Sequence, residues 1–262
     1  MEYKGNGVAL TLFGLEVRWY AIFIVTGMML AVKLLSREMK RRGMDPEKAY
    51  DLAMVILPSG IIGARLWYVI FEFQRFNSFF DIINLRNGGL AIQGGLMGAS
   101  IAALIFAKVQ SYSFLRLSDM VFPYVAMAQS IGRWGNFTNN EAHGGPTNLP
   151  WALKIGGETY HPTFLYESLG DLLIFAFLYY YTRKKLKVDG QVTMLYLILY
   201  GALRFFVEGL RTDSLYWGNI RVAQALSIIG IVIGIAGFII LSSKEANAHI
   251  PGKSPITENN ID

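Results

Sequence analysis

The chain contains no cysteine among its 262 residues, and this absence removes several kinds of chemistry at once. Without a thiol, the protein has no disulfide framework, thiolate zinc site, iron–sulfur cluster or cysteine nucleophile. Histidine is also scarce, since only His143, His161 and His249 are present. So few histidines leave little for a metal site, and we expect neither a bound metal nor another cofactor.

Charge is the second shortage. Charged residues make up 16% of the chain, whereas soluble globular domains average about 25%. Hydrophobic residues make up 53%, and the mean hydropathy is +0.36. This balance indicates a membrane protein and argues against an intrinsically disordered chain or a nucleic-acid-binding domain. The net charge of +5 fits a basic rim on the cytoplasmic side of a membrane.

Long apolar stretches are what the sequence has in quantity. Seven of them are near the ~20 residues needed to cross a hydrocarbon layer of ~30 Å. They cover residues 17–35, 52–71, 89–107, 117–131, 163–181, 192–207 and 223–241. A spanning backbone must satisfy its own hydrogen bonds, and these runs are too continuous for the strands of an outer-membrane barrel. We therefore predict an all-α polytopic membrane protein with about seven transmembrane helices.

Basic clusters in the connections give the expected orientation. The first connection carries Arg37, Lys40, Arg41, Arg42 and Lys48, and the fifth carries Arg183, Lys184, Lys185 and Lys187. Such clusters mark cytoplasmic loops, so we expect the N-terminus outside and the C-terminus in the cytoplasm. No basic segment with a small-residue cleavage site precedes the first stretch, which we expect to stay in the mature protein. Residues 1–243 then form one transmembrane domain, and residues 244–262 form a polar, flexible cytoplasmic tail.

A few charged residues lie where a membrane makes them costly. A charge at the centre of a spanning helix costs about 2.5–3.5 kcal/mol on insertion scales. Arg65 lies in the second stretch, and Arg204 and Glu208 lie four residues apart near the outer end of the sixth. Arg133 begins the long outer connection, residues 132–161, and Glu141 follows it. On this topology Arg133, Glu141, Arg204 and Glu208 all lie toward the outer face, and we expect one polar cavity that opens toward the outer leaflet.

Several guanidinium groups in a partly dry cavity suit an anion with many oxygens, and phosphate matches their planar donor pattern. In a membrane the plentiful phosphate is a lipid headgroup, so the residues predict a phospholipid-handling site whose carboxylates orient the arginines or move protons. Structural alternatives remain open. The pair Arg204–Glu208 could be an internal ion pair whose sole role is to stabilise helix packing. Arg65 could extend to the interface, and Arg133 and Asn136 could be ordinary loop residues. The glycines of Gly94-Gly95-Leu96-Met97-Gly98, Gly230 and Gly234 are typical of close helix packing.

Six ordered segments carry a family resemblance over nearly the whole chain. They are Arg18-Trp19-Tyr20, Gly63-Ala64-Arg65-Leu66-Trp67-Tyr68, Gly88-Gly89-Leu90-Ala91-Ile92-Gln93-Gly94-Gly95, the stretch from Gly132 to Gly144, His161-Pro162-Thr163-Phe164-Leu165-Tyr166-Glu167, and Tyr200 to Glu208 with Arg211. Together they resemble the bacterial prolipoprotein diacylglyceryl transferase family. The stretch around Arg133 is the most specific of the six.

The resemblance implies an enzyme that transfers the diacylglyceryl group of phosphatidylglycerol to the lipobox cysteine thiol of a prolipoprotein. A thioether forms and glycerol phosphate leaves, which is the first step of bacterial lipoprotein maturation. The thiol belongs to the substrate, so an enzyme without cysteine loses nothing. The implied partners are phosphatidylglycerol, the prolipoprotein signal peptide and the lipid bilayer. The implied location is the bacterial cytoplasmic membrane, with the active site toward the outer leaflet.

The resemblance also implies roles for single residues. The catalytic residues would be Arg133, Arg204, Glu141 and Tyr20. The residues that bind phosphatidylglycerol would be Arg133, Asn136, Gly144, Arg204, Glu208, Arg65 and Gln93. In this scheme the arginines take the phosphate, Asn136 and Gly144 shape the headgroup pocket, the two glutamates hold the arginines or relay the proton, and the tyrosine contributes its hydroxyl.

Two departures from the family pattern bear on the mechanism. Gln93 replaces a histidine that is considered as the base, and an amide cannot take up a proton at neutral pH. Either His161, Glu141 or Tyr20 is then the base, or the thiol arrives largely ionised. Asn140 stands where glycine is usual before the glutamate. The other function classes are a transporter or flippase for an anionic lipid, against which stands the lack of an internal repeat, and a structural membrane subunit.

Overall fold

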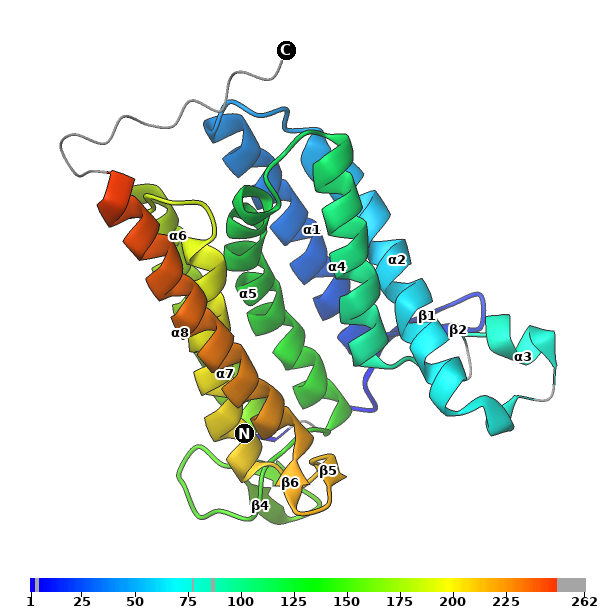
Figure 1. Ribbon diagram of the computed structural model, residues 1–262. Coiled ribbons are helices and arrows are strands. Elements are labelled where there is room, and N and C mark those ends of the chain that lie inside the picture. The colour runs from blue at the N-terminus through cyan, green and yellow to red at the C-terminus, as the bar shows by residue number, and fades with distance from the viewer. Residues whose placement is uncertain (3–4, 77, 86–87, 249–262) are drawn as a thin grey trace. The chain divides into compact units, whose positions relative to one another are not determined.

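The computed structural model describes residues 1–2, 5–76, 78–85 and 88–248 (Figure 1). Its helices are α1 (Trp19–Arg41), α2 (Lys48–Phe71), α3 (Phe79–Ile83), α4 (Ile92–Val109), α5 (Phe114–Asn139), α6 (Thr163–Lys184), α7 (Gln191–Leu210) and α8 (Val222–Ala248), with a short 3-10 helix, η1 (Phe73–Arg75). Three two-stranded antiparallel hairpins are β1–β2 (Val8–Leu12, Leu15–Arg18), β3–β4 (Leu153–Ile155, Glu158–Tyr160) and β5–β6 (Tyr216–Trp217, Ile220–Arg221).

Each of the seven predicted stretches is a long helix, which confirms the helical class. Five of these helices, α1, α2, α4, α7 and residues 222–243 of α8, are long and apolar enough to cross a membrane, and most of their side chains are not buried within the protein. These helices make the chain a polytopic membrane protein. Helices α5 and α6 are not among these five, and the count of seven spans and the direction of the termini stay predictions.

Two expected boundaries fall in different places. Helix α5 continues to Asn139, so residues 132–139 are helical and not part of the long connection. Helix α8 continues to Ala248, past the predicted start of the tail at residue 244. The remainder of the predicted tail, with His249, lies outside the described residues.

The chain divides into two compact units, which are described separately. One comprises Met1–Ala31 and Ser118–Asp262, and the other comprises Val32–Leu117. In the first unit the core joins helices α5, α6 and α7 through five buried side chains: Ala126, Ile174, Leu178, Val192 and Tyr196. Helix α8 packs on α7 where Gly234 brings the two backbones together, since a Cβ there would lie 2.8 Å from the Met194 carbonyl oxygen.

A carboxylate from α5 fixes the start of α7. Asp119 is fully buried, and it accepts hydrogen bonds from the backbone N–H groups of Gly190 at 2.6 Å and Thr193 at 2.8 Å. The first N–H groups of a helix have no partner within the helix, and its N-terminus favours negative charge. Asp119 provides both the hydrogen-bond acceptors and the negative charge at the start of α7, and so sets the position of α7 along α5.

In the second unit, α2 and α4 pack backbone to backbone. A Cβ on Gly94 would lie 2.2 Å from the Gly63 carbonyl oxygen, and a Cβ on Gly98 would lie 2.4 Å from the Ser59 carbonyl oxygen. No side chain fits at such distances. The prediction of a close-packing role for these glycines is confirmed, and it follows the use of small residues at helix interfaces in membranes.

Arg65 of α2 anchors the segment that joins α2 to α4. Its guanidinium donates to five backbone carbonyl oxygens, those of Asp81 at 2.6 Å, Ile82 at 2.7 Å, Asn84 at 3.0 Å, Gly88 at 2.7 Å and Gly89 at 2.9 Å. The side chain is buried, so Arg65 is not exposed at the surface of the protein. Unpaired carbonyl groups are costly near a membrane, and one arginine satisfies five of them here.

The α2–α4 contact predicts a difference between adjacent glycines. Gly94→Ala should lower the stability of the purified protein by about 1–3 kcal/mol, because the new methyl group forces the helices apart. Gly95→Ala places its methyl group in ordinary contact, 3.4 Å from the Gly60 carbonyl oxygen, and should be neutral or slightly stabilising. Thermal unfolding in detergent measures both. Equal effects of the two substitutions would contradict the packing described here.

Candidate functional site

Arg133 and Asn136 lie in the last turns of α5, not in a loop. This corrects both the expected start of the connection and the alternative in which they are ordinary loop residues. A helix fixes the direction of its side chains more tightly than a loop does, and the Arg133 side chain is only about one-fifth exposed. The guanidinium of Arg133 is therefore held at a defined position beside α6.

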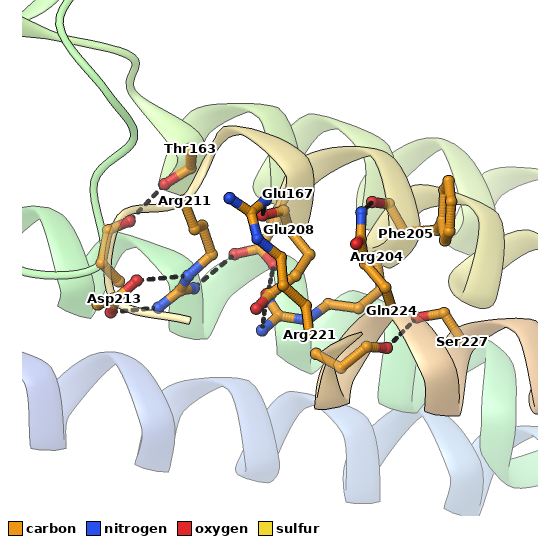
Figure 2. Close-up of polar contacts among 12 residues, drawn as sticks. Thr163, Glu167, Arg204, Phe205, Glu208, Arg211, Asp213, Arg221, Gln224 and Ser227 are labelled. Atoms are coloured by element: carbon orange, nitrogen blue, oxygen red, sulfur yellow. Dashed lines mark hydrogen bonds and ion pairs between the residues drawn. The ribbon is translucent and has the colours of Figure 1, made fainter. Parts of the chain in front are cut away.

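Glu167 of α6 lies at the centre of a cluster of three arginines. Its Oε1 lies 2.5 Å from Nη1 of Arg204, and its Oε2 lies 3.2 Å from Nη1 of Arg133 and 3.8 Å from Nη1 of Arg211. The carboxylate is almost completely buried. Figure 2 shows Glu167 with Arg204 and Arg211. The three guanidinium groups come from α5, α7 and the residue after α7, so one carboxylate joins three parts of the chain.

Two further carboxylates, Glu208 and Asp213, form ion pairs with Arg204 and Arg211. Glu208 lies one turn after Arg204 on α7, with 2.7 Å between its Oε2 and Nη2 of Arg204. Asp213 accepts two hydrogen bonds from Arg211, from Nε at 2.9 Å and Nη2 at 2.7 Å (Figure 2). This bidentate hydrogen bond from Arg211 lowers the pKa of Asp213 below its ordinary value. The two hydrogen bonds to Asp213 fix the plane of the Arg211 guanidinium group, and Glu208 places a second negative charge beside Arg204.

Asp171 lies one helical turn after Glu167 and is fully buried. In the described part of the chain neither of its carboxylate oxygens receives a hydrogen bond. The carboxylate interacts electrostatically with Arg133 and Arg204. Together with Glu167 it gives α6 an acidic face toward the two arginines.

The turn after α5 gathers amides around Glu141. The carboxylate oxygen Oε1 accepts from the side chains of Asn136 at 3.1 Å and Asn139 at 3.2 Å. Asn140 has a φ of 51°, in the left-handed region that glycine and asparagine tolerate best, which explains why asparagine replaces the usual glycine. Among the described residues Glu141 is exposed and contacts these amides, so the predicted contact with an arginine is not present in this structure.

Gly144 lies where the connection meets the start of α6 and the end of α7. Its N–H donates to the His161 carbonyl oxygen at 2.9 Å, and it pairs with Arg211 in an isolated bridge. A Cβ at this position would lie 2.7 Å from Cβ of His161 and 2.8 Å from the Leu210 carbonyl oxygen. Only glycine fits this crossing, which brings His161 and Arg211 to the same junction. The Nδ1 atom of His161 lies 3.3 Å from the Tyr166 hydroxyl oxygen.

Tyr20 lies in the first turn of α1 and contacts α5 beside Arg133. A Cβ on Gly135 would lie 2.6 Å from Cδ2 of Tyr20, so the absence of a side chain at residue 135 lets the aromatic ring lie against the helix backbone. The first unit thus contains eight of the predicted residues: Tyr20, Arg133, Asn136, Glu141, Gly144, His161, Arg204 and Glu208.

Arg65 and Gln93 belong to the second unit. Gln93 is half-buried in the first turn of α4. The predicted contacts of Arg65 and Gln93 with phosphatidylglycerol stay predictions, but all five N–H groups of Arg65 are already engaged by backbone carbonyl oxygens. In this structure Arg65 therefore has a positioning role.

Sequence reasoning did not assign roles to Glu167, Asp171 or Arg211. The signal was available, because Glu167 and Asp171 are acidic residues four apart within a predicted span and are subject to the cost argument applied to Arg204. Arg211 lies three residues after Glu208, just beyond the apolar stretch, where a basic residue is ordinary. Its membership of the cluster depends on the chain turning back at the end of α7.

The geometry defines a class of protein. Several apolar helices make it a polytopic membrane protein, and a buried cluster of paired arginines at its helix ends presents donors for an anion with several oxygens. A family model described as prolipoprotein diacylglyceryl transferase matches residues 7–240. The chain therefore belongs to the prolipoprotein diacylglyceryl transferase family, and the sequence-based resemblance is confirmed.

Curated relatives agree over nearly their full lengths. The phosphatidylglycerol–prolipoprotein diacylglyceryl transferase of Clostridioides difficile strain 630 is 46% identical over 241 residues, which cover 92% of this chain and 97% of that protein. The protein of the same name from Finegoldia magna is 48% identical over 229 residues, covering 87% of this chain and 92% of that protein. The phosphatidylglycerol–prolipoprotein diacylglyceryl transferase 1 of Clostridium perfringens strain 13 is 46% identical over 253 residues, covering 91% of this chain and 95% of that protein.

The arginine cluster predicts that Glu167 is needed for stability. Glu167→Gln leaves Arg133 and Arg204 buried without their shared counter-charge, and should cost about 3–5 kcal/mol. The double variant Glu167→Gln with Arg204→Gln should cost less than the sum of the single variants, because the two groups act on each other. Thermal unfolding of the purified variants measures both effects. The matched control is Glu158→Gln, at an exposed hairpin carboxylate, where stability should not change. Additive costs would show that Glu167 does not act through the arginines.

Proposed function

We propose that this chain transfers the diacylglyceryl group of phosphatidylglycerol to the lipobox cysteine thiol of prolipoproteins, with the arginine cluster as its phosphate site. The observation that carries the proposal is the convergence of Arg133, Arg204 and Arg211 on Glu167 in a member of this family. The names of the relatives give the two substrates of those proteins, phosphatidylglycerol and prolipoprotein. The arginine cluster supports phosphatidylglycerol as the lipid substrate, because guanidinium donors suit the oxygens of a phosphodiester.

Arg133 is the best-placed residue to bind the phosphate. Among the described residues it forms an ion pair with Glu167 through Nη1, so its other N–H groups are available to a ligand. Arg204 already pairs with Glu167 and Glu208, and it would add charge more than free donors. Asn136 and Gly144 border this region and would shape the space for the headgroup, while Arg65 is left out of the proposed phosphate site.

The reaction requires one negative charge to be stabilised on the leaving group. The thiolate sulfur attacks the glycerol carbon that bears the phosphate ester, the carbon–oxygen bond breaks, and glycerol phosphate leaves with the electron pair. The phosphodiester carries one negative charge and the released monoester carries two, the second coming from the thiolate. Fixed guanidinium groups in a low-dielectric site lower the energy of that growing charge.

The residue that takes the thiol proton stays open between His161, Glu141 and Tyr20. Gln93 cannot accept the proton, and in the described structure Glu141 is exposed at the end of α5 and could exchange protons with water. His161 has its Nδ1 beside the Tyr166 hydroxyl, which would leave Nε2 as the accepting atom. Tyr20 would contribute its hydroxyl to orient a substrate.

The proposed setting is the bacterial cytoplasmic membrane, crossed seven times, with the N-terminus outside and the arginine cluster toward the outer leaflet. The basic residues of the first and fifth connections support this direction. A transporter or flippase for an anionic lipid is not favoured, since the family and the relatives' names describe a transferase.

The decisive experiment incubates purified protein with phosphatidylglycerol and a lipobox peptide and follows the peptide by mass spectrometry. A mass gain of one diacylglyceryl unit on the cysteine is the expected result. A peptide that stays unmodified while the lipid crosses vesicle membranes would instead support the flippase.

Arg133 should be needed for turnover more than for folding. Arg133→Gln should lower kcat about 10²- to 10³-fold in the peptide assay, as expected for the loss of one preorganised donor at a developing charge. Arg133→Lys should retain part of the rate, because it keeps the charge but not the planar pair of donors. The matched control is Arg75→Gln, at an exposed arginine beside Glu72, which should leave kcat unchanged. Full activity of Arg133→Gln would rule out the proposed phosphate site.

Substitutions at two adjacent glycines distinguish an effect on the site from a general effect on the loop. Gly144→Ala forces a methyl group against His161 and the Leu210 carbonyl oxygen, and should reduce transfer at least tenfold by moving the junction beside Arg211. Gly145→Ala places its methyl group in open space, and should keep the wild-type rate. Rates and unfolding temperatures are compared for both variants. If Gly145→Ala were as impaired as Gly144→Ala, the close crossing at residue 144 would not be the reason.

A further inference from the structure

The three hairpins of the first unit differ in what their ends expose. Hairpin β1–β2 turns at Phe13–Gly14 and exposes Leu12, Phe13 and Leu15. Hairpin β5–β6 turns at Gly218–Asn219 and exposes Leu215, Tyr216, Trp217 and Ile220. Hairpin β3–β4 turns at Gly156–Gly157 and carries the exposed charged residues Lys154 and Glu158 on its strands. Strand β2 also carries the exposed charged residues Glu16 and Arg18, so charge on the strands does not distinguish the hairpins. The difference lies in exposed large apolar side chains, which β1–β2 and β5–β6 have at their turn ends and the described residues of β3–β4 lack.

The apolar ends are exposed to an unusual degree. The Phe13 side chain is fully exposed, and the Trp217 side chain is 85% exposed. Removing these aromatic side chains from water would be favourable in free energy. Exposed apolar patches of this kind mark interaction sites. Both ends have defined turns, with positive φ at Gly14 and at Gly218.

The two apolar hairpins are continuous with helices that are apolar enough to cross a membrane. Strand β2 ends at Arg18 and α1 begins at Trp19, while β6 ends at Arg221 and α8 begins at Val222. The apolar ends therefore lie next to the places where spanning helices leave the membrane.

Hairpin β5–β6 is also tied to the arginine cluster. Arg221 donates from Nη1 to the Glu208 carbonyl oxygen at 2.6 Å and from Nε to the Tyr216 hydroxyl at 2.8 Å. Arg211 and Asp213 precede this hairpin on the same connection between α7 and α8 (Figures 1 and 2). A contact that fixes the depth of the hairpin would therefore also fix the depth of this part of the cluster.

We propose that hairpins β1–β2 and β5–β6 insert their apolar ends into the headgroup region of the bilayer, while hairpin β3–β4 stays in water. Tryptophan and tyrosine prefer this region because their rings are apolar and their N–H and O–H groups reach water. The paired backbone of a hairpin satisfies its inner hydrogen-bonding groups, and headgroups and water satisfy the outer ones at this shallow depth. The occupant of the apolar surface is the lipid surface itself.

The absence of cysteine makes the proposal directly testable. Single cysteines are introduced as Leu12→Cys and Trp217→Cys, with Glu158→Cys as the control in hairpin β3–β4, and each is labelled with an environment-sensitive fluorophore. The full-length protein is reconstituted into vesicles of phosphatidylglycerol and phosphatidylcholine. Quenching is measured with a lipid that carries a nitroxide high on its acyl chain and, separately, with aqueous iodide. Leu15→Cys and Ile220→Cys give a second position in each apolar hairpin if a first variant does not fold.

The expected result is several-fold stronger quenching by the nitroxide lipid at residues 12 and 217 than at residue 158, with the reverse order for iodide. Quenching at residues 12 and 217 equal to that at residue 158 would overturn the proposal. Labels that stay accessible to iodide in vesicles, and become protected only when a lipobox peptide is added, would also overturn it, because the surface would then bind the peptide. The measurement needs no turnover, so its failure is distinguishable from failure of the proposed function.

Discussion

Buried charge is the constraint on which the rest of this structure depends. An arginine in the low-dielectric interior of a membrane protein is tolerated only when opposite charge and hydrogen-bond acceptors surround it. Glu167 meets that requirement for Arg133 and Arg204 together, and Arg211 lies close enough to join them. One carboxylate on α6 therefore determines how α5, α6 and α7 are aligned at their site end. At the other end of α7, the buried Asp119 of α5 does the same for the helix N-terminus.

Arg65 obeys the same constraint by a different route. In the described part of the chain it donates all five N–H groups to main-chain carbonyl oxygens of one connecting segment and to no carboxylate. Arg65 is held rigid because each of its donors has an acceptor, whereas Arg133 is held through one of its nitrogens, Nη1, by Glu167. The difference lies in what each can still bind, because Arg133 retains donors and Arg65 does not.

The long helices were predictable from the sequence because continuous apolar stretches of spanning length leave few alternatives. The meeting of Arg133 with Arg204 was also predicted, from their shared position near one end of the expected spans. The central position of Glu167 was not, because a list of charges does not say which carboxylate faces which arginine until the rotation of each helix is known. The role of Arg65 was missed for a similar reason. Its acceptors are backbone carbonyl groups, which every residue has, so the sequence does not show which ones it contacts. The continuation of α5 to Asn139 was missed because its last turns are polar, and a polar helix end has the composition of a loop.

The pairing of the arginines bears on how the proposed reaction would be driven. A phosphodiester that enters the cluster competes with Glu167 for the same guanidinium groups, so part of its attraction is offset in the ground state. As the carbon–oxygen bond breaks, the leaving phosphate gains a full negative charge, and its attraction to Arg133 and Arg204 grows while that of Glu167 stays constant. Interactions that strengthen only as the bond breaks accelerate the step, whereas equal binding of substrate and transition state does not. A cluster whose arginines already have carboxylate partners is therefore suited to catalysis more than to tight lipid binding.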